Sequence, residues 1–288
     1  MVTIVADTTS SIPIPRAAEL GIPYVPQLIM FGEETYRDGQ DMDTQTFLKR
    51  LKESPILPKT AAPPPAFYAP IYENFTGNGG TVIVLTPSAD VSGTFRSAEV
   101  AALDFPSRDI RVIDTRLVGS GLGSIVVNAN QWAQDGLDPD TIIKRVKDLA
   151  SREIVYFVLD TLEYLYKGGR IGGAKLLAGS LLQVKPILQL KNGRTEPVES
   201  QRTKKRAMAR LKELVYTNCP HQKEAFLTVM HGDILDEAKA LTEELKANLG
   251  ISEIDIYDLP PAILVHAGPG VIAVSYFTET KTNNLLTE

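Results

Sequence analysis

The sequence predicts an α/β protein with two domains. In the first half, short apolar runs alternate with helical patterns, which is typical of parallel strands joined by crossover helices. After about residue 155 the pattern changes, and Asn192-Gly193 between two strand-like runs is a strong hairpin signal. We therefore expect a mostly parallel sheet flanked by helices in residues 1–155 and a mixed α+β domain in residues 156–288. The two domains are expected to meet at a cleft.

The first half contains four strand-like segments and three legible helices. The strands are expected at 2–6, 24–30, 81–85 and 110–114. Apolar residues at three- and four-residue spacing predict helices at 94–105, 122–133 and 142–150, the last beginning after Pro139. The polar run Asp7-Thr8-Thr9-Ser10-Ser11 predicts a turn with a helix cap, and the prolines of 54–70 predict an extended loop.

The second half mixes strands and helices less regularly. Strands are expected at 155–159, 186–190, 196–200, 226–230, 254–257, 263–265 and 271–277, and helices at 161–167, 203–216 and from 233 onward. The glycine-rich run 168–173 is not followed by the Lys-Ser or Lys-Thr of a phosphate-binding loop. A glycine cap and a sharp turn between helices account for it better.

Composition excludes several classes of function. The formal net charge of −5 and the lack of a basic block beyond Lys204-Lys205-Arg206 argue against a nucleic-acid partner. A single cysteine, Cys219, excludes an internal disulfide, and the three histidines lack metal-ligand spacing, so no metal is expected. The N-terminus resembles a first strand and not a signal peptide, and no apolar run approaches the ~20 residues of a membrane span, so we expect a cytoplasmic protein.

Two short loops carry the candidate chemistry. Residues 86–94 follow the run 82–85, and residues 266–270 follow the run 263–265. Both place small hydrogen-bonding residues and glycines where a strand is expected to end, which is where open α/β sheets bind ligands. Hydroxyls and an imidazole can donate to a carboxylate without a fixed counter-charge. The loops are therefore predicted to hold the acidic head of a bound ligand without cleaving it.

Each loop also has a plainer interpretation. Ser92-Gly93-Thr94 matches a helix N-cap, although a helix N-terminus also offers free N–H groups to an anion. The carboxylate of Asp90 would oppose an anion unless it points away. His266 matches a buried structural histidine, but Gly268-Pro269-Gly270 indicates a tight turn or a close approach.

Arg202 begins a cationic run, Arg202-Thr203-Lys204-Lys205-Arg206, at the start of a predicted helix. Cations are unfavourable there because the N-terminal end of a helix is electropositive. A solvated basic face is the default explanation. The position also suggests that Arg202 serves something outside its own helix.

Taken in order, the motifs of this chain resemble those of the DegV family of bacterial lipid-binding proteins. The resemblance covers nearly the whole chain. It rests on Val5-Ala6-Asp7-Thr8-Thr9, the Thr60 loop, Ser92-Gly93-Thr94, Val112-Ile113-Asp114-Thr115, Leu162-Glu163-Tyr164-Leu165 with Gly168-Gly169-Arg170-Ile171, Lys185-Pro186-Ile187, Arg202-Thr203 and His266-Ala267-Gly268-Pro269-Gly270.

The resemblance implies a two-domain α/β protein with a long-chain fatty acid in an internal tunnel between the domains, and no other cofactor. Its carboxylate would bind Thr60, Ser92, Gly93 and His266. It also implies a separate kinase subunit that phosphorylates the carboxylate for phospholipid synthesis, with Arg202 at the hand-over and a transient contact with a membrane. The protein itself would be the lipid-carrying subunit and not an enzyme.

The chain departs from the family pattern at three places. Residues 61–64 read Ala-Ala-Pro-Pro where a Ser-Gln-Pro-Ser-like run is usual, Ala267 replaces a common threonine, and the opening motif is Asp-Thr-Thr instead of Asp-Ser-Thr. The lost hydroxyls affect the wider head-group network.

Two other functions compete with lipid binding. A serine-type ester hydrolase would use Ser92 as nucleophile and His266 as base, but Val-Ser-Gly-Thr lacks the first glycine of a nucleophile elbow. A nucleotide enzyme acting alone would need a triphosphate loop or an acidic magnesium cluster, and no convincing one is visible.

Overall fold

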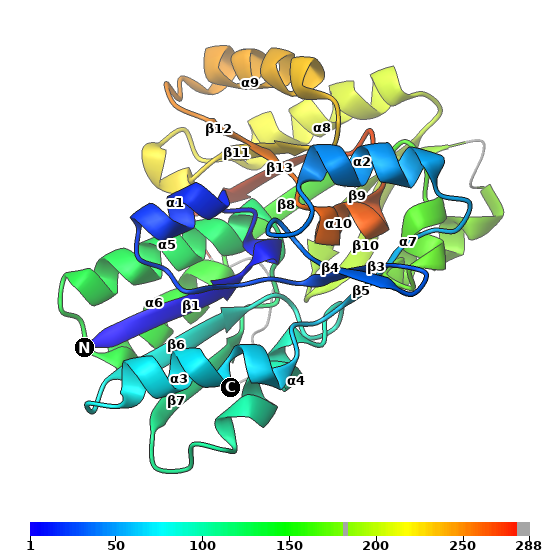
Figure 1. The fold of residues 1–288 in the computed structure, drawn as a ribbon. Coiled ribbons are helices and arrows are strands. Elements are labelled where there is room, and N and C mark those ends of the chain that lie inside the picture. The colour runs from blue at the N-terminus through cyan, green and yellow to red at the C-terminus, as the bar shows by residue number, and fades with distance from the viewer. Residues whose placement is uncertain (181–183, 281–288) are drawn as a thin grey trace.

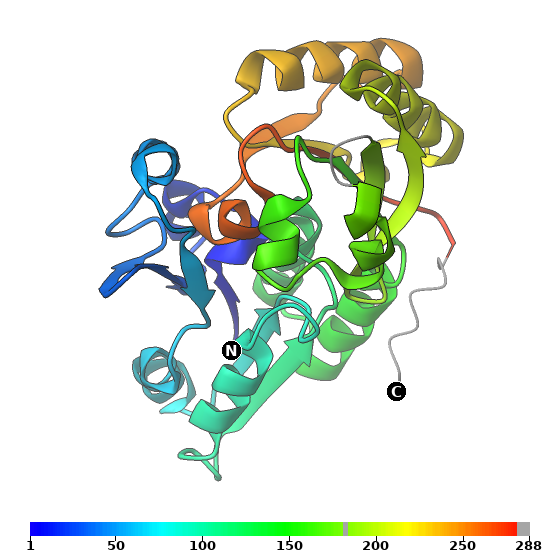
Figure 2. The same cartoon turned by 90° about the vertical axis from the view of Figure 1, so that its right-hand side faces the viewer.

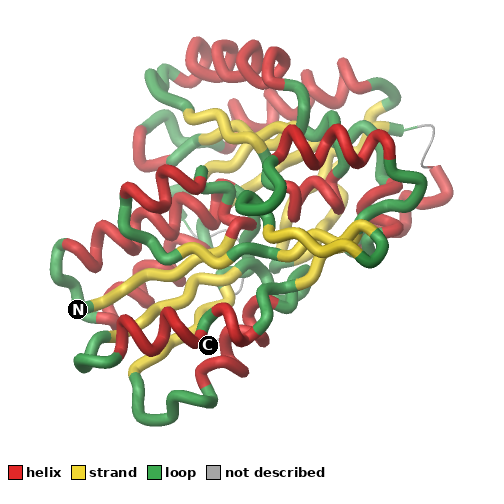
Figure 3. Tube along the Cα trace, viewed as in Figure 1, coloured by secondary structure: helices red, strands yellow, loops and turns green. Residues whose placement is uncertain are grey.

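The computed structural model describes residues 1–180 and 184–280, and Figure 3 shows how their helices and strands are interleaved. The first sheet is parallel, in the order β2-β1-β6-β7. Its strands are β1 (Val2–Asp7), β2 (Tyr24–Val25), β6 (Thr81–Thr86) and β7 (Asp109–Asp114). The parallel first half is confirmed. Because β1 and β6 are buried on both faces, they consist of near-continuous apolar runs.

Helices cover both faces of this parallel sheet (Figure 1). Successive side chains of a strand point to opposite faces, so Ile4 packs in one hydrophobic cluster and Val5 in another. The first cluster includes α5 (Ser120–Gln134) and α6 (Pro139–Ala150). The second includes α3 (Ala69–Thr76) and α4 (Thr94–Ala102).

The second sheet has six strands in the order β10-β9-β8-β13-β11-β12, and only the β11–β12 pair is parallel. The strands are β8 (Glu153–Val158), β9 (Lys185–Lys191), β10 (Arg194–Gln201), β11 (Thr228–His231), β12 (Asp255–Asp258) and β13 (Ile272–Phe277). β9 and β10 form the predicted hairpin. Its turn residues Asn192 and Gly193 both have positive φ, as a two-residue type I′ turn requires.

One face of the second sheet is covered by α8 (Lys204–Asn218) and α9 (Leu235–Leu249), which lie together at the top of Figure 2. The other face packs against α2 (Thr44–Glu53), α7 (Glu163–Lys167), α10 (Pro261–Ala267) and a third, antiparallel sheet. The third sheet has the order β4-β3-β5, from β3 (Leu28–Phe31), β4 (Glu34–Arg37) and β5 (Lys59–Ala61).

The third sheet and α2 come from the first quarter of the chain but share a hydrophobic cluster with the second sheet. Ile29 and Phe47 pack there with Leu159 and Leu264. The predicted division between residues 155 and 156 falls inside β8 and remains a prediction.

The remaining elements are short. They are α1 (Ile14–Glu19) and four 3-10 segments, η1 (Thr8–Ser10), η2 (Pro65–Phe67), η3 (Gly172–Ser180) and η4 (Lys223–Ala225). Asp7 caps η1 through a bond from the Thr9 N–H, as the polar run after the first strand predicts. Over the two described ranges, no helix combines the length and the apolar character needed to cross a membrane.

The expectation of a strand at 263–265 is wrong, because these residues lie in α10. A short apolar run does not distinguish a buried strand from a buried helical turn. The signal for the helix was Pro261, which occupies the first helical turn, where its fixed φ is favourable. His266 therefore sits in the last turn of a helix and not after a strand.

Candidate functional site

A cavity lies where the second and third sheets meet the segments that follow the strands of the first sheet. The empty space between its lining atoms, its mouth included, is about 1040 Å³. Thr60, Ser92, Gly93 and His266, which the sequence analysis selected, all line this one cavity.

Most of the cavity wall is apolar. The second sheet contributes alternate residues of its strands, since every second side chain faces the same side. Helices and loops add further apolar side chains. The apolar lining includes Val155, Phe157, Leu165, Leu190, Met230, Ile263, Val271 and Ala273.

Thr60 and His266 meet directly at the polar part of the wall. The Thr60 Oγ1 atom, on β5, lies 2.8 Å from Nε2 of His266, at the end of α10. These residues are 206 positions apart in the chain. The contact depends on the packing of the third sheet against α10.

Ser92 approaches the cavity from the loop that precedes α4. Its Oγ lies 2.8 Å from Oγ1 of Thr94 and accepts a longer bond, 3.3 Å, from the Thr94 backbone N–H. Gly93 occupies the N-cap position and provides no side-chain cap. Ser92-Gly93-Thr94 is thus both the start of a helix and part of the cavity wall.

His266 is a neutral imidazole near pH 7. Burial lowers its pKa to about 4, and the positive charge of Arg170 acts in the same direction. Its Nδ1 is buried and makes no hydrogen bond within the described part of the chain. The backbone of Gly168 approaches this atom so closely that an added Cβ would lie 2.3 Å from Nδ1. Gly168 therefore leaves room for the ring.

Arg170 is a site residue that the sequence analysis did not select. It lines the cavity, where its Nε donates to the Val91 carbonyl (2.9 Å) and its Nη1 to the Gly168 carbonyl (2.8 Å). Burial lowers the pKa of its guanidinium. Arg170 thus joins the loop of Ser92 to the turn beside His266. The sequence feature that could have indicated Arg170 as a site residue is its position as the one cation in the glycine-rich run 168–173.

The glycines after His266 allow a close approach, as the sequence suggested. Gly268 has a φ of 73°, and a Cβ there would lie 2.4 Å from the ring of Tyr164 on α7. The turn thus combines a left-handed backbone with tight packing of α7 against α10.

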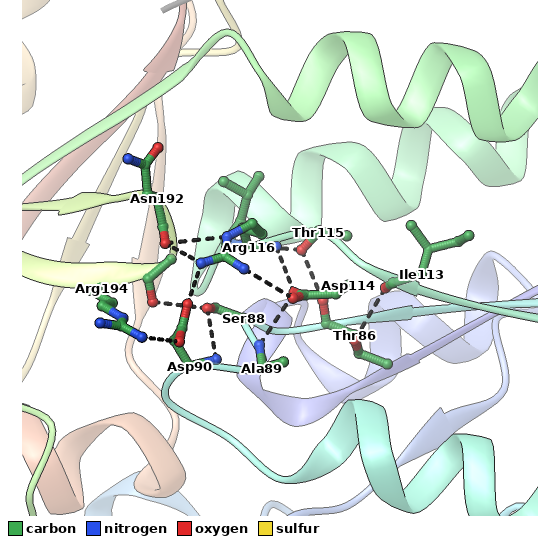
Figure 4. A network of polar contacts seen from close by, with 12 residues as sticks. Thr86, Ser88, Ala89, Asp90, Ile113, Asp114, Thr115, Arg116, Asn192 and Arg194 are labelled. Atoms are coloured by element: carbon green, nitrogen blue, oxygen red, sulfur yellow. Dashed lines mark hydrogen bonds and ion pairs between the residues drawn. The ribbon is translucent and has the colours of Figure 1, made fainter. Parts of the chain in front are cut away.

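The Asp90 side chain belongs to a polar network with Arg116 and Arg194 (Figure 4). Its carboxylate pairs with Arg116 and, at 2.8 Å, with Arg194. The hydrogen bond from Arg194 is the main reason that its pKa lies below the usual range. In the same network, the Ser88 hydroxyl donates to the Gly193 carbonyl oxygen at 2.8 Å. The network joins the Ser92 loop to the β9–β10 hairpin and pairs the carboxylate of Asp90 with two arginines.

Arg202 is exposed and does not line the cavity. It lies between the end of β10 and Thr203, whose side chain caps α8 through the N–H of Arg206. The structure therefore brings four of the five selected residues to one cavity and leaves the fifth on the surface.

Comparisons with known proteins agree with this architecture. The family model described as "Uncharacterised protein, DegV family" matches residues 1–279. A DegV domain-containing protein of Halalkalibacterium halodurans is 32% identical over 279 residues, which are 96% of this chain and 99% of the relative. Another, from Streptomyces coelicolor, is 34% identical over 276 residues, or 95% and 97% of the two chains.

Solved structures give the same result. A DegV family protein of Thermus thermophilus, described as binding fatty acid, superposes with a TM-score of 0.88 and 29% identity over 96% of this chain and 99% of that one. DegV of Bacillus subtilis, described as a fatty acid binding protein, gives a TM-score of 0.85 and 30% identity over the same shares. The chain belongs to the DegV family.

Proposed function

We propose that this protein binds a long-chain fatty acid in the cavity, with the carboxylate at Thr60, Ser92 and His266. The observation that carries the proposal is the composition of the cavity wall, which is mostly apolar and also contains these three polar side chains. The fatty-acid-binding relatives of Thermus thermophilus and Bacillus subtilis, which share the fold at full length, support it.

The apolar wall supplies most of the binding free energy in this proposal. Each buried methylene stabilises by ~0.8 kcal/mol, so a chain of ~16 carbons gains about 12 kcal/mol before the costs of ordering. Ordering and association remove several kcal/mol, and tight binding remains.

The polar wall supplies orientation. A carboxylate accepts hydrogen bonds and donates none, which matches the hydroxyls of Ser92 and Thr60. The Thr60 hydroxyl is free to donate to the ligand when its oxygen accepts from Nε2–H of neutral His266. The positive charge of Arg170, half-buried in the same wall, adds a favourable long-range term.

We further propose that the protein presents the carboxylate to a separate kinase, which phosphorylates it to an acyl phosphate. The exposed position of Arg202, outside the cavity and free to meet another protein, supports a role at that contact. Arg202 carries a permanent positive charge, and guanidinium groups bind phosphate through paired N–H donors.

The geometry does not favour the ester-hydrolase alternative. Ser92 pairs with Thr94, whereas His266 pairs with Thr60. A Ser–His pair also needs a group that orients the imidazole, and Nδ1 of His266 has no hydrogen-bond partner among the described residues.

Mass spectrometry of an organic extract from the purified protein tests the binding proposal. We expect a stoichiometric long-chain fatty acid, or its uptake when lipid-free protein is incubated with hexadecanoic acid. A folded protein that neither carries nor takes up the acid would contradict the proposal.

Arg202→Ala tests whether Arg202 takes part in presenting the carboxylate to the kinase. With the cognate kinase, we expect acyl phosphate formation to fall about tenfold, as for the loss of one charge-assisted contact, while the lipid content is unchanged. Arg16→Ala, which removes another exposed arginine on α1, is the matched control. Equal rates for the two variants would remove Arg202 from the hand-over.

A further inference from the structure

Ser92 is the last member of a hydrogen-bonded chain that begins at a buried carboxylate. Gln27 Nε2 donates to Oδ2 of Asp7 at 2.7 Å and to Oγ1 of Thr94 at 2.8 Å, and Thr94 Oγ1 lies 2.8 Å from Oγ of Ser92. Asp7, Gln27 and Thr94 are 2%, 3% and 1% exposed, so water does not compete for these bonds. The four residues come from β1, the segment before β3, α4 and the loop before α4.

The carboxylate of Asp7 fixes the direction of the first bond. An ionised carboxylate only accepts, and its Oδ1 already accepts from the backbone N–H and the hydroxyl of Thr9. Oδ2 therefore requires the amide nitrogen of Gln27 and not its oxygen. Burial raises the pKa of Asp7 to about 6, so the group is still mostly ionised near pH 7.

The direction of the hydrogen bond at Asp7 determines which atoms donate in the bonds to Thr94 and Ser92. Because Gln27 donates to the Thr94 hydroxyl, that oxygen does not need a proton from Ser92. The Thr94 hydroxyl donates its own proton to Oγ of Ser92 across their 2.8 Å contact. The backbone N–H of Thr94 also donates to Ser92 Oγ. The proton of Ser92 is left for the cavity.

We infer that Asp7 and Gln27 are positioning residues that make Ser92 a hydrogen-bond donor toward the ligand, and so select a carboxylate over a neutral lipid head. The inference rests on the proposed function and adds a basis for its specificity. A carboxylate needs donors from the wall, whereas the hydroxyl of a fatty alcohol can donate as well as accept.

Asp7→Asn should exchange donors and acceptors along this hydrogen-bonded chain, while the shape of the side chain hardly changes. The new amide keeps its oxygen toward Thr9 and turns its nitrogen toward Gln27, which must then present Oε1. Oε1 accepts the proton of Thr94, and the buried Thr94 oxygen then draws the proton of Ser92. Ser92 no longer donates into the cavity.

The test is a competition between two ligands of equal chain length. Each lipid-free protein is incubated with an equimolar mixture of hexadecanoic acid and 1-hexadecanol, and the bound ratio of acid to alcohol is measured by mass spectrometry. We expect the ratio to fall about tenfold in Asp7→Asn and in Gln27→Met, as for the loss of one hydrogen bond to a charged group. Glu153→Gln is the matched control, because Glu153 is also a buried acid but bonds to Ser275 and lies outside the hydrogen-bonded chain that ends at Ser92.

The outcomes separate the two proposals. Wild-type protein that binds the acid, with the same ratio in Asp7→Asn and Gln27→Met, would overturn the positioning role alone. Wild-type protein that binds neither ligand would overturn the proposed function and this inference with it. If Asp7→Asn loses both ligands because its fold is damaged, Gln27→Met decides, and an unchanged ratio there overturns the inference.

Discussion

The polar and apolar parts of the cavity wall are built in different ways. Thr60, Ser92 and His266 come from three elements that meet only in the folded chain, and each depends on a neighbour for its orientation. The apolar part combines alternating side chains of the second sheet with many apolar side chains from α7, α10 and the loops. Affinity in the proposed complex is therefore spread over many contacts, whereas orientation depends on a few polar atoms.

A larger side chain in the apolar part of the cavity should have the largest effect on fatty acid affinity. Ala273→Phe, on β13, places a ring in the cavity. Displacing about five methylenes costs about 4 kcal/mol, or a roughly thousandfold loss of fatty acid affinity. Titration of lipid-free protein with hexadecanoic acid measures it.

Ala209→Phe, at an exposed position of α8, adds the same atoms outside the cavity and should leave affinity unchanged. If the folded Ala273→Phe variant still binds the acid as the wild type does, the hydrocarbon tail does not lie against this part of the wall.

The polar part should make stability depend on pH. The pKa of His266 is lowered from 6.5 to about 4, so the unfolded chain binds the extra proton first. The contribution of the neutral ring is complete above about pH 6.5 and is lost as the pH falls toward 4, by up to about 3 kcal/mol. Urea unfolding of lipid-free wild type and His266→Gln at pH 7 and pH 4 measures this difference.

Burial raises the pKa of Asp7 to about 6, so its effect on stability as the pH falls is opposite to that of His266. Asp7 is present in both wild type and His266→Gln, so its contribution cancels in the difference between their free energies of unfolding. A free-energy difference between wild type and His266→Gln that does not change with pH would mean that the imidazole is not buried as a neutral ring.

Removing one hydroxyl from the polar part should have the smallest effect on lipid retention. We expect Ser92→Ala to keep its lipid, because the tail supplies the affinity, while acyl phosphate formation falls about tenfold through a poorly oriented carboxylate. Ser124→Ala, on α5 and away from the cavity, is the control. Complete loss of lipid from folded Ser92→Ala and His266→Ala would contradict the separation between affinity and orientation.

Local patterns were sufficient for most elements. The apolar runs at 2–6 and 81–85 form β1 and β6, and Asn192-Gly193 forms the β9–β10 turn. These features depend on side-chain period and turn chemistry within a few residues. The same approach joined β2 and β3 in one expected strand, 24–30, and did not identify α2, β4 or β5. The apolar faces of α2 and the third sheet are defined by the second sheet that they contact.

The candidate site divides in the same way. Ser92 and His266 were selected because small polar residues and glycines followed apolar runs, and the family resemblance added Thr60. Arg170 and the chain from Asp7 to Ser92 were not selected, because an arginine among glycines and a buried aspartate after a strand have ordinary structural explanations.

The sequence by itself determined the two-part α/β architecture, the family and the polar residues available to a ligand, since these follow from the order of residues along the chain. Only the tertiary structure decided that His266 ends a helix against Gly168 and bonds Thr60, and that Asp90 turns to Arg194. Contacts between residues a hundred or more positions apart depend on how separate elements pack, and no local pattern contains that information.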